Sequence, residues 1–162
     1  MRNMFASEVY KHALERKELV LLSGDIGNNL FNGFRKDVGE RFYNCGVAEA
    51  NMMGFSAGLA LVGFKPFVYT ITPFTTFRCM EQIKIDVCYH NLPVTIVGVG
   101  AGLSYASLGA THHSLEDLAM LRSLPNLTVL APADSVELKN ALQFAMDHPG
   151  PMAHNVTDLA LL

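Results

Sequence analysis

Short apolar runs alternate along the chain with longer segments whose apolar residues recur at helical spacing. The apolar runs predict buried strands over 18–23, 41–45, 65–71, 93–99, 127–131 and a last segment after Pro151. The longer segments predict helices over 3–17, 47–62, 73–90, 114–122 and 134–146. Strands that alternate with helices imply right-handed crossovers and a parallel sheet. We therefore expect an α/β fold, a three-layer domain over residues 1–162 in which helices cover both faces of the sheet.

Local signals mark some of the element boundaries. Pro73 opens an expected helix, because proline is tolerated in a first helical turn. Ser114 and Asp117 have the spacing of a capping box, and Asp134 is expected to cap the helix that follows it. Segment 26–33 is rich in asparagine and glycine, which predicts a loop.

The composition is apolar for a monomer of this size. Half of the residues are hydrophobic and 17% are charged, which indicates strands buried on both faces or a buried subunit contact. The formal net charge of −3 comes without a basic run, so nucleic acid and anionic membranes are not expected as partners. No uninterrupted apolar run approaches the about 18 residues of a membrane-spanning helix.

The cysteines indicate the compartment. Cys45, Cys79 and Cys88 are odd in number and share no metal-ligand spacing. The chain shows no signal-peptide pattern. Three thiols in such a chain fit a reducing cytosol, so we expect a cytoplasmic protein without a metal site of its own.

In this architecture ligands bind beyond the carboxyl ends of the strands. The polar and glycine-rich segments at these ends are Asp25, 46–49, 71–74, 98–113 and 132–134. Glu49 is the one acidic side chain in the small, apolar stretch 45–54. It has two interpretations: a first-turn acid that complements the helix dipole, or a desolvated carboxyl held for proton chemistry.

Two glycine-rich segments resemble ligand-binding loops without matching them. Gly98-Val99-Gly100-Ala101-Gly102 follows a strand, but its GxGxG spacing departs from the dinucleotide fingerprint and no helical segment follows at once. A nucleotide-binding oxidoreductase is kept as an alternative on this loop alone. Segment 23–29 offers one carboxylate and two amides, which favours turn chemistry over a magnesium site.

Two ring side chains are candidates for ligand contact. His112 and His113 are adjacent, and neighbours on an extended segment point in opposite directions, so they do not chelate one ion well. A single histidine here can bond a substrate oxygen or transfer a proton. The alternative is that its ring nitrogens only form hydrogen bonds with the nearby backbone. Phe74 follows Pro73 at a strand-to-helix junction, where its ring can face a flat heterocycle.

The segment Gly46-Val47-Ala48-Glu49-Ala50-Asn51-Met52 resembles the pyrimidine-domain signature of transketolases and their relatives, including 1-deoxyxylulose-5-phosphate synthases. The match continues in family order through 57–60, 63–67, 109–113, 121–126 and 132–134. The resemblance implies part of a thiamine-diphosphate enzyme that transfers a two-carbon ketol unit between sugar phosphates through the cofactor's ylide. A 1-deoxyxylulose-5-phosphate synthase-like part, or a non-catalytic assembly or regulatory module, is the alternative.

The resemblance also implies roles for individual residues. Glu49 would bond the aminopyrimidine ring nitrogen para to the amino group, and we expect its carboxyl to be buried with a raised pKa. Phe74 would stack on the pyrimidine, and Asp25 would line the same cleft. His112 would touch sugar oxygens, and Arg2 would bind the substrate phosphate.

The departures from the family pattern define a missing partner. The motif that binds diphosphate and Mg²⁺ belongs to a separate domain that this chain lacks, so we expect Mg²⁺ only there and expect the chain alone to be inactive. A diphosphate-binding subunit or domain is the expected partner, in a homodimer or hetero-oligomer. Leu108, Gly100 and Asp158 stand where the family carries aspartate, histidine and arginine, which leaves the sugars open. A natural split subunit and a piece of a longer enzyme both remain open.

Overall fold

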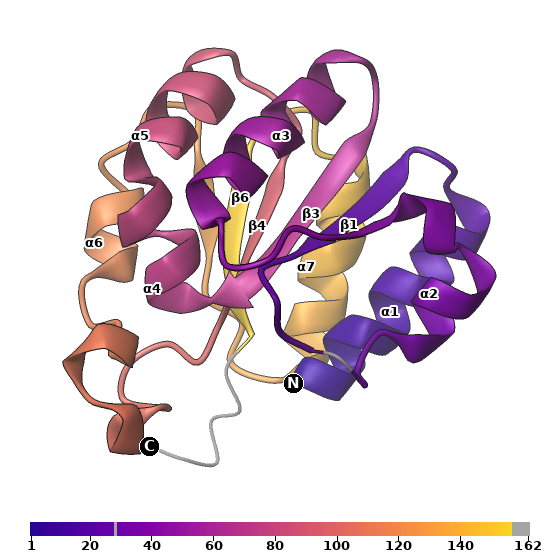
Figure 1. Cartoon of the computed structure of the whole chain (residues 1–162). Helices are drawn as coiled ribbons and strands as arrows, with labels where there is room; N and C mark the ends of the chain where they lie inside the picture. The colour runs from indigo at the N-terminus through magenta and orange to yellow at the C-terminus, as the bar shows by residue number, and fades with distance from the viewer. Residues whose placement is uncertain (28, 157–162) are drawn as a thin grey trace.

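The computed structural model describes residues 1–27 and 29–156, and six strands in it form one sheet. They are β1 (Leu19–Ser23), β2 (Phe42–Asn44), β3 (Lys65–Ile71), β4 (Thr95–Val99), β5 (Thr128–Leu130) and β6 (Met152–Val156). All neighbours pair in parallel, in the order β2-β1-β3-β4-β6-β5. The predicted parallel α/β fold is confirmed (Figure 1).

Helices cover both faces of this sheet (Figure 1). One face packs against α1 (Arg2–Glu15), α2 (Asn32–Asp37) and α7 (Ser135–Asp147). The other face packs against α3 (Glu49–Leu61), α6 (Asp117–Leu121) and segment 72–89. Two buried clusters result, one on each side of the sheet. Within residues 1–27 and 29–156, no helix combines the length and apolar character needed to cross a membrane.

The central strands follow directly from their composition. β1 and β4 are buried at all of their positions, because each has a strand on either side and helices on both faces. Such strands read as continuous apolar runs rather than as an alternating pattern. Their positions could therefore be predicted closely from the sequence.

The strand order reverses between β1 and β3. β2 pairs with one side of β1, and the chain then returns through α3, on the other face, to pair β3 with the opposite side of β1. Open α/β sheets bind ligands at such a switch point, outside the carboxyl ends of the strands. The segments that follow β1 and β3, together with the start of α3, therefore bound the expected site.

The single helix predicted over 73–90 is wrong. That segment is divided into α4 (Thr72–Thr75), the 3-10 turn η2 (Phe77–Cys79), α5 (Met80–Gln82) and the π-helix η3 (Ile83–Tyr89). The first break has a local cause, because the carbonyl of Thr72 accepts hydrogen bonds from the hydroxyls of Thr75 (3.0 Å) and Thr76 (2.7 Å). Hydroxyls that bond back to a carbonyl compete with the helix ladder and bend it.

The capping box predicted at Ser114 is also wrong. The Ser114 backbone instead forms an antiparallel bridge with Gly102, and α6 begins only at Asp117. Asp134 does cap α7, since its carboxylate accepts from the backbone amides of Val136 (2.8 Å) and Glu137 (2.9 Å). The predicted cap of α7 is therefore confirmed.

The loop predicted over 26–33 ends early, because α2 begins at Asn32. Phe31 and Phe34 are buried on the α1 side of the sheet and anchor this short helix. Two apolar residues give too little periodicity to predict a helix of this length.

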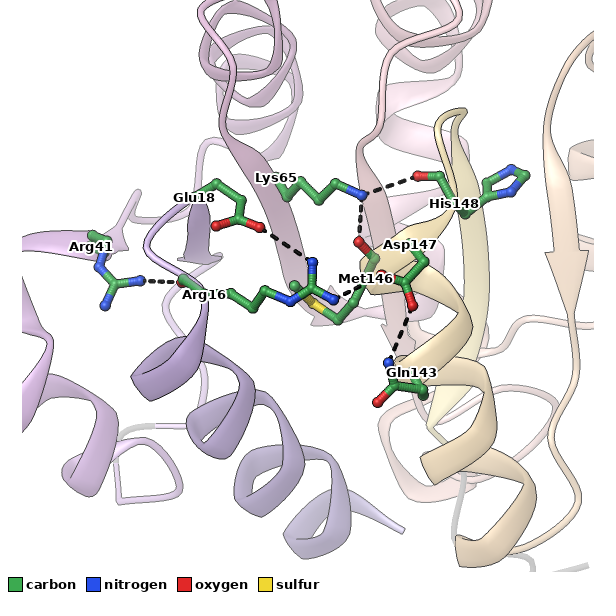
Figure 2. A network of polar contacts seen from close by, with 8 residues as sticks. All are labelled: Arg16, Glu18, Arg41, Lys65, Gln143, Met146, Asp147 and His148. Atoms are coloured by element: carbon green, nitrogen blue, oxygen red, sulfur yellow. Dashed lines mark hydrogen bonds and ion pairs between the residues drawn. The ribbon is translucent and has the colours of Figure 1, made fainter.

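Near the amino ends of the strands, Lys65 and Arg16 form hydrogen bonds with the end of α7 (Figure 2). Lys65 begins β3, and its ammonium donates hydrogen bonds to the carbonyls of Met146 and His148 at the end of α7. Burial lowers the pKa of Lys65. Arg16, at the end of α1, bonds Asp147 at 2.8 Å. These contacts tie α7 to the sheet at the edge opposite the expected site.

Replacing Lys65 with methionine should lower the free energy of unfolding by about 1–3 kcal/mol, because two helix-end carbonyls lose their donor. Chemical denaturation measures the change. Lys139→Met is the matched control: Lys139 is exposed and lies 3.9 Å from Glu8, so its loss should cost less than about 1 kcal/mol. Equal losses in the two variants would contradict a locking role for Lys65.

His154 on β6 should make the fold sensitive to acid. Burial lowers the pKa of His154 to about 4, from an ordinary value of 6.5. Between pH 6.5 and 4, His154 therefore binds a proton in the unfolded chain but not in the folded chain. The free energy of unfolding falls as the pH drops through this range, by roughly 3 kcal/mol at most. Urea unfolding across this range should show a weaker pH dependence in His154→Phe. An equal decrease in the free energy of unfolding at low pH in both proteins would exclude His154 as its source.

Candidate functional site

Glu49 lies at the switch point, as the first residue of α3. Its side chain is 2% exposed, so the burial expected of it is found. Gly24, just after β1, permits this arrangement. A Cβ atom at Gly24 would lie 2.9 Å from Cβ of Thr70 and 3.4 Å from Cγ of Glu49. The carboxylate therefore lies against the ends of β1 and β3.

Arg78 supplies the counter-charge that sequence reasoning missed. Its Nη1 donates a hydrogen bond to Oε2 of Glu49 at 2.7 Å. The Arg78 side chain is 44% exposed, whereas the carboxylate is buried. The burial of Glu49 could be expected from its apolar neighbours, but its pairing with Arg78 could not. The sequence gives one signal for the pair, which is that Arg78 follows Phe74 by one helical turn. The break in the helix at Thr76 removed the value of that spacing.

The same guanidinium lies against an aromatic ring. The Arg78 Cζ atom is 4.2 Å from the centroid of the Phe74 ring, which is a cation–π contact. Phe74 belongs to α4, directly after β3, where the sequence placed it. A buried carboxylate and a ring face are thus held together by one planar cation.

His112 joins this group through Phe74. The two rings meet edge to face, with centroids 5.1 Å apart. His112 ends the 3-10 turn η5 (Ala110–His112), and its Nδ1 lies 2.9 Å from the Thr111 hydroxyl. The structure therefore brings together Glu49, Phe74 and His112, three of the predicted site residues.

Asp25 and Arg2 lie outside that group. Asp25 accepts a hydrogen bond from Asn44 at 3.0 Å and adopts a left-handed backbone, with φ at 55°. It follows Gly24, so it lies on the same edge as Glu49. Arg2, at the start of α1, lines a cavity of about 630 Å³ on the opposite face of the sheet. Asp158, where an arginine was expected, lies outside the described residues.

Tyr105 connects the Arg2 cavity to the Glu49 group. Its side chain lines the same cavity as Arg2, and its ring centroid is 6.2 Å from that of His112. The cavity also includes Tyr69 and Val99 from the ends of β3 and β4. The Arg2 cavity and the group of Glu49, Phe74 and His112 therefore meet at the carboxyl ends of the strands.

The glycine-rich loop after β4 is not a dinucleotide fingerprint. A helix should follow such a fingerprint at once, but the next α-helix is α6, which begins at Asp117. The loop is closed by the bridge between Gly102 and Ser114. Gly100 has a positive φ, and a Cβ atom there would lie 2.3 Å from the Tyr105 ring. These glycines shape the loop that carries His112.

The thiol of Cys79, the residue after Arg78, is not suited to act as a nucleophile near neutral pH. Cys79 is buried, and burial together with the nearby Glu49 raises its pKa to about 12. The reactive form of cysteine is the thiolate, which is therefore scarce near neutral pH. Across residues 1–27 and 29–156, no group of three His, Cys, Asp or Glu side chains is arranged to hold a metal ion.

A doubly wound parallel sheet with a buried acid and an aromatic face at its switch point defines a ligand-binding α/β domain. The family model described as "Transketolase, pyrimidine binding domain" matches residues 1–154. The chain belongs to this family, and the resemblance identified from the motif at 46–52 is confirmed.

Individual relatives agree with this assignment. A subunit of the apulose-4-phosphate transketolase of Phocaeicola vulgatus is 36% identical over 152 residues, covering 93% of this chain and 49% of the relative. "1-deoxy-D-xylulose-5-phosphate synthase 1" of Geobacter sulfurreducens is 36% identical over 151 residues, 93% of this chain and 23% of the relative. The chain thus spans about half the length, or less, of the curated relatives it matches.

A solved structure matches the fold closely. It is described as "Split gene transketolase, inactive beta4 tetramer" and superposes with a TM-score of 0.86 at 34% sequence identity. The match covers 96% of this chain and 50% of that one. Split-gene transketolases therefore occur among the structural relatives of this chain.

Proposed function

We propose that residues 1–162 form the pyrimidine-binding domain of a thiamine-diphosphate-dependent transferase of the transketolase type. One observation carries the proposal: the buried Glu49 carboxylate and the Phe74 ring face already hold a planar cationic group between them. An aminopyrimidine is also flat and offers a ring nitrogen to a carboxyl. The donor set of this site therefore fits the aminopyrimidine end of thiamine diphosphate.

Thiamine diphosphate, when bound, supplies the nucleophilic carbon that such transferases require. Glu49 would hold a proton at the pyrimidine ring nitrogen para to the amino group. Its burial suits that role, because it keeps water away from the bond between the carboxyl and the ring nitrogen. Phe74 would orient the ring, and Asp25 would line the cleft beside it.

The sugar-phosphate substrate would occupy the edge between Arg2 and His112. Arg2 lines the cavity of about 630 Å³ and would bind the phosphate. His112 would bond to sugar oxygens from the loop after β4. Leu108 and Gly100 depart from the transketolase pattern, so no particular sugar is proposed. A 1-deoxyxylulose-5-phosphate synthase-like activity is the second candidate, supported by the relative from Geobacter sulfurreducens.

A partner subunit would supply the diphosphate-binding domain and its Mg²⁺. Exposed apolar side chains beside Glu49 support such a contact: Val47 is 74% exposed, and the rings of Tyr43 and Phe55 pack together at 5.4 Å. We call these three residues the β2–α3 surface. A homodimer or hetero-oligomer would bury it. The free thiols Cys45, Cys79 and Cys88 are compatible with a reducing cytoplasm.

Glu49→Gln should strongly reduce activity in the enzyme reconstituted with a diphosphate-domain subunit. An amide cannot share the proton, so ketol transfer should fall by at least about 10²-fold, the range of general acid–base contributions. Glu8→Gln is the matched control, since Glu8 is also buried and ion-paired but lies on α1. Undiminished turnover in Glu49→Gln would remove Glu49 from the mechanism.

Val47→Asp should weaken assembly with the diphosphate-domain subunit by at least about tenfold, because it places an unpaired charge in the proposed contact. Size-exclusion chromatography of mixed subunits measures the effect. Val136→Asp is the control, because Val136 is similarly exposed at 67% but lies on α7, across the sheet. If the two variants assemble equally well, the β2–α3 surface is not the contact.

A further inference from the structure

Arg78 engages both groups that the proposed function assigns to the cofactor ring. We propose that Arg78 is a latch: its guanidinium closes the site between Glu49 and Phe74, and it must leave that position before a pyrimidine can enter. This inference rests on the proposed function. It goes further by assigning to this chain a residue that controls entry to the site.

The competition follows from geometry. The guanidinium holds Oε2 of Glu49 at 2.7 Å and lies 4.2 Å from the Phe74 centroid. A pyrimidine that bonded Glu49 and stacked on the same face of Phe74 would need the space Arg78 fills. Two flat groups cannot occupy one ring face together, so binding of one excludes the other.

Arg78 is also the one member of the trio suited to move. Its side chain is 44% exposed, whereas that of Glu49 is fixed in the interior. Arg78 and Phe74 line an open cavity of about 660 Å³ that also includes Thr111, which leaves room for the guanidinium to turn outward. An ion pair with one solvated partner is partly screened and breaks more easily than a fully buried pair.

The latch resolves a problem of charge. A buried carboxylate without a partner is strongly unfavourable. Arg78 balances Glu49 while the site is closed. When the site opens, the pyrimidine ring nitrogen would bind together with one proton taken up from solvent, and the N–H formed in this way would pair with Glu49. One planar donor is exchanged for another, so Glu49 is paired in both states.

The test uses thiamine, which carries the pyrimidine but no phosphate, and the full chain without a partner. Isothermal titration should show that Arg78→Met binds thiamine at least tenfold more tightly than the wild type, which is about 1.4 kcal/mol. Arg35→Met is the matched control, because Arg35 lies 5.4 Å from the Phe42 ring on the other side of the sheet. Its affinity for thiamine should be unchanged.

A second variant covers the case in which Arg78→Met does not fold. Arg78→Lys keeps a counter-charge for Glu49 but loses the planar group, so its affinity for thiamine should lie between those of the wild type and Arg78→Met. In the wild type, thiamine should shift the ¹⁵Nε resonance of Arg78 and leave that of Arg35 in place.

Unchanged, weaker or absent thiamine binding in folded Arg78 variants would overturn the latch. That failure is separate from failure of the proposed function, which the turnover of Glu49→Gln in the reconstituted enzyme decides. If Glu49→Gln loses turnover while Arg78→Met gains no affinity, only the latch is wrong. If Glu49→Gln keeps full turnover, the assignment of the site itself is wrong.

Discussion

The ion pair between Glu49 and Arg78 is the interaction on which the site depends. Glu49 lies almost wholly out of water at the switch point of the sheet, where an unbalanced charge would be strongly unfavourable. Arg78 balances it from a side chain that still reaches solvent. The ring of Phe74 then lies against the guanidinium, and His112 packs against Phe74. One arginine therefore contacts two of the predicted site residues directly, and the third joins them through Phe74.

The contacts at the amino ends of the strands differ from those at the carboxyl ends, where the candidate site lies. At the amino edge, Lys65 and Arg16 hold the end of α7 through carbonyls and a carboxylate. At the carboxyl edge, Gly24 lets Glu49 approach β3, and the helix that begins at Thr72 is interrupted. The sheet thus presents polar groups on the loops and short helical segments that follow its strands, which is typical of α/β ligand sites.

Much of this could be predicted from the sequence, for physical reasons. Strands such as β1 and β4 are buried on both faces and so appear as apolar runs, and Glu49 stands out as an acid among small residues. The contact of Arg78 could not be predicted, because it depends on the turn made by the Thr75 and Thr76 hydroxyls. The Ser114 cap failed because a backbone bridge to Gly102, a non-local contact, took precedence over the local motif.

The outermost strands, β2 and β5, are three residues long each. Edge strands this short offer an approaching chain very few unpaired amides and carbonyls. Association by continued sheet growth, the route to fibrillar aggregates, is therefore disfavoured even while apolar side chains such as Val47 stay exposed. The β2–α3 surface can therefore stay exposed while the short outer strands give little opportunity for association through the backbone.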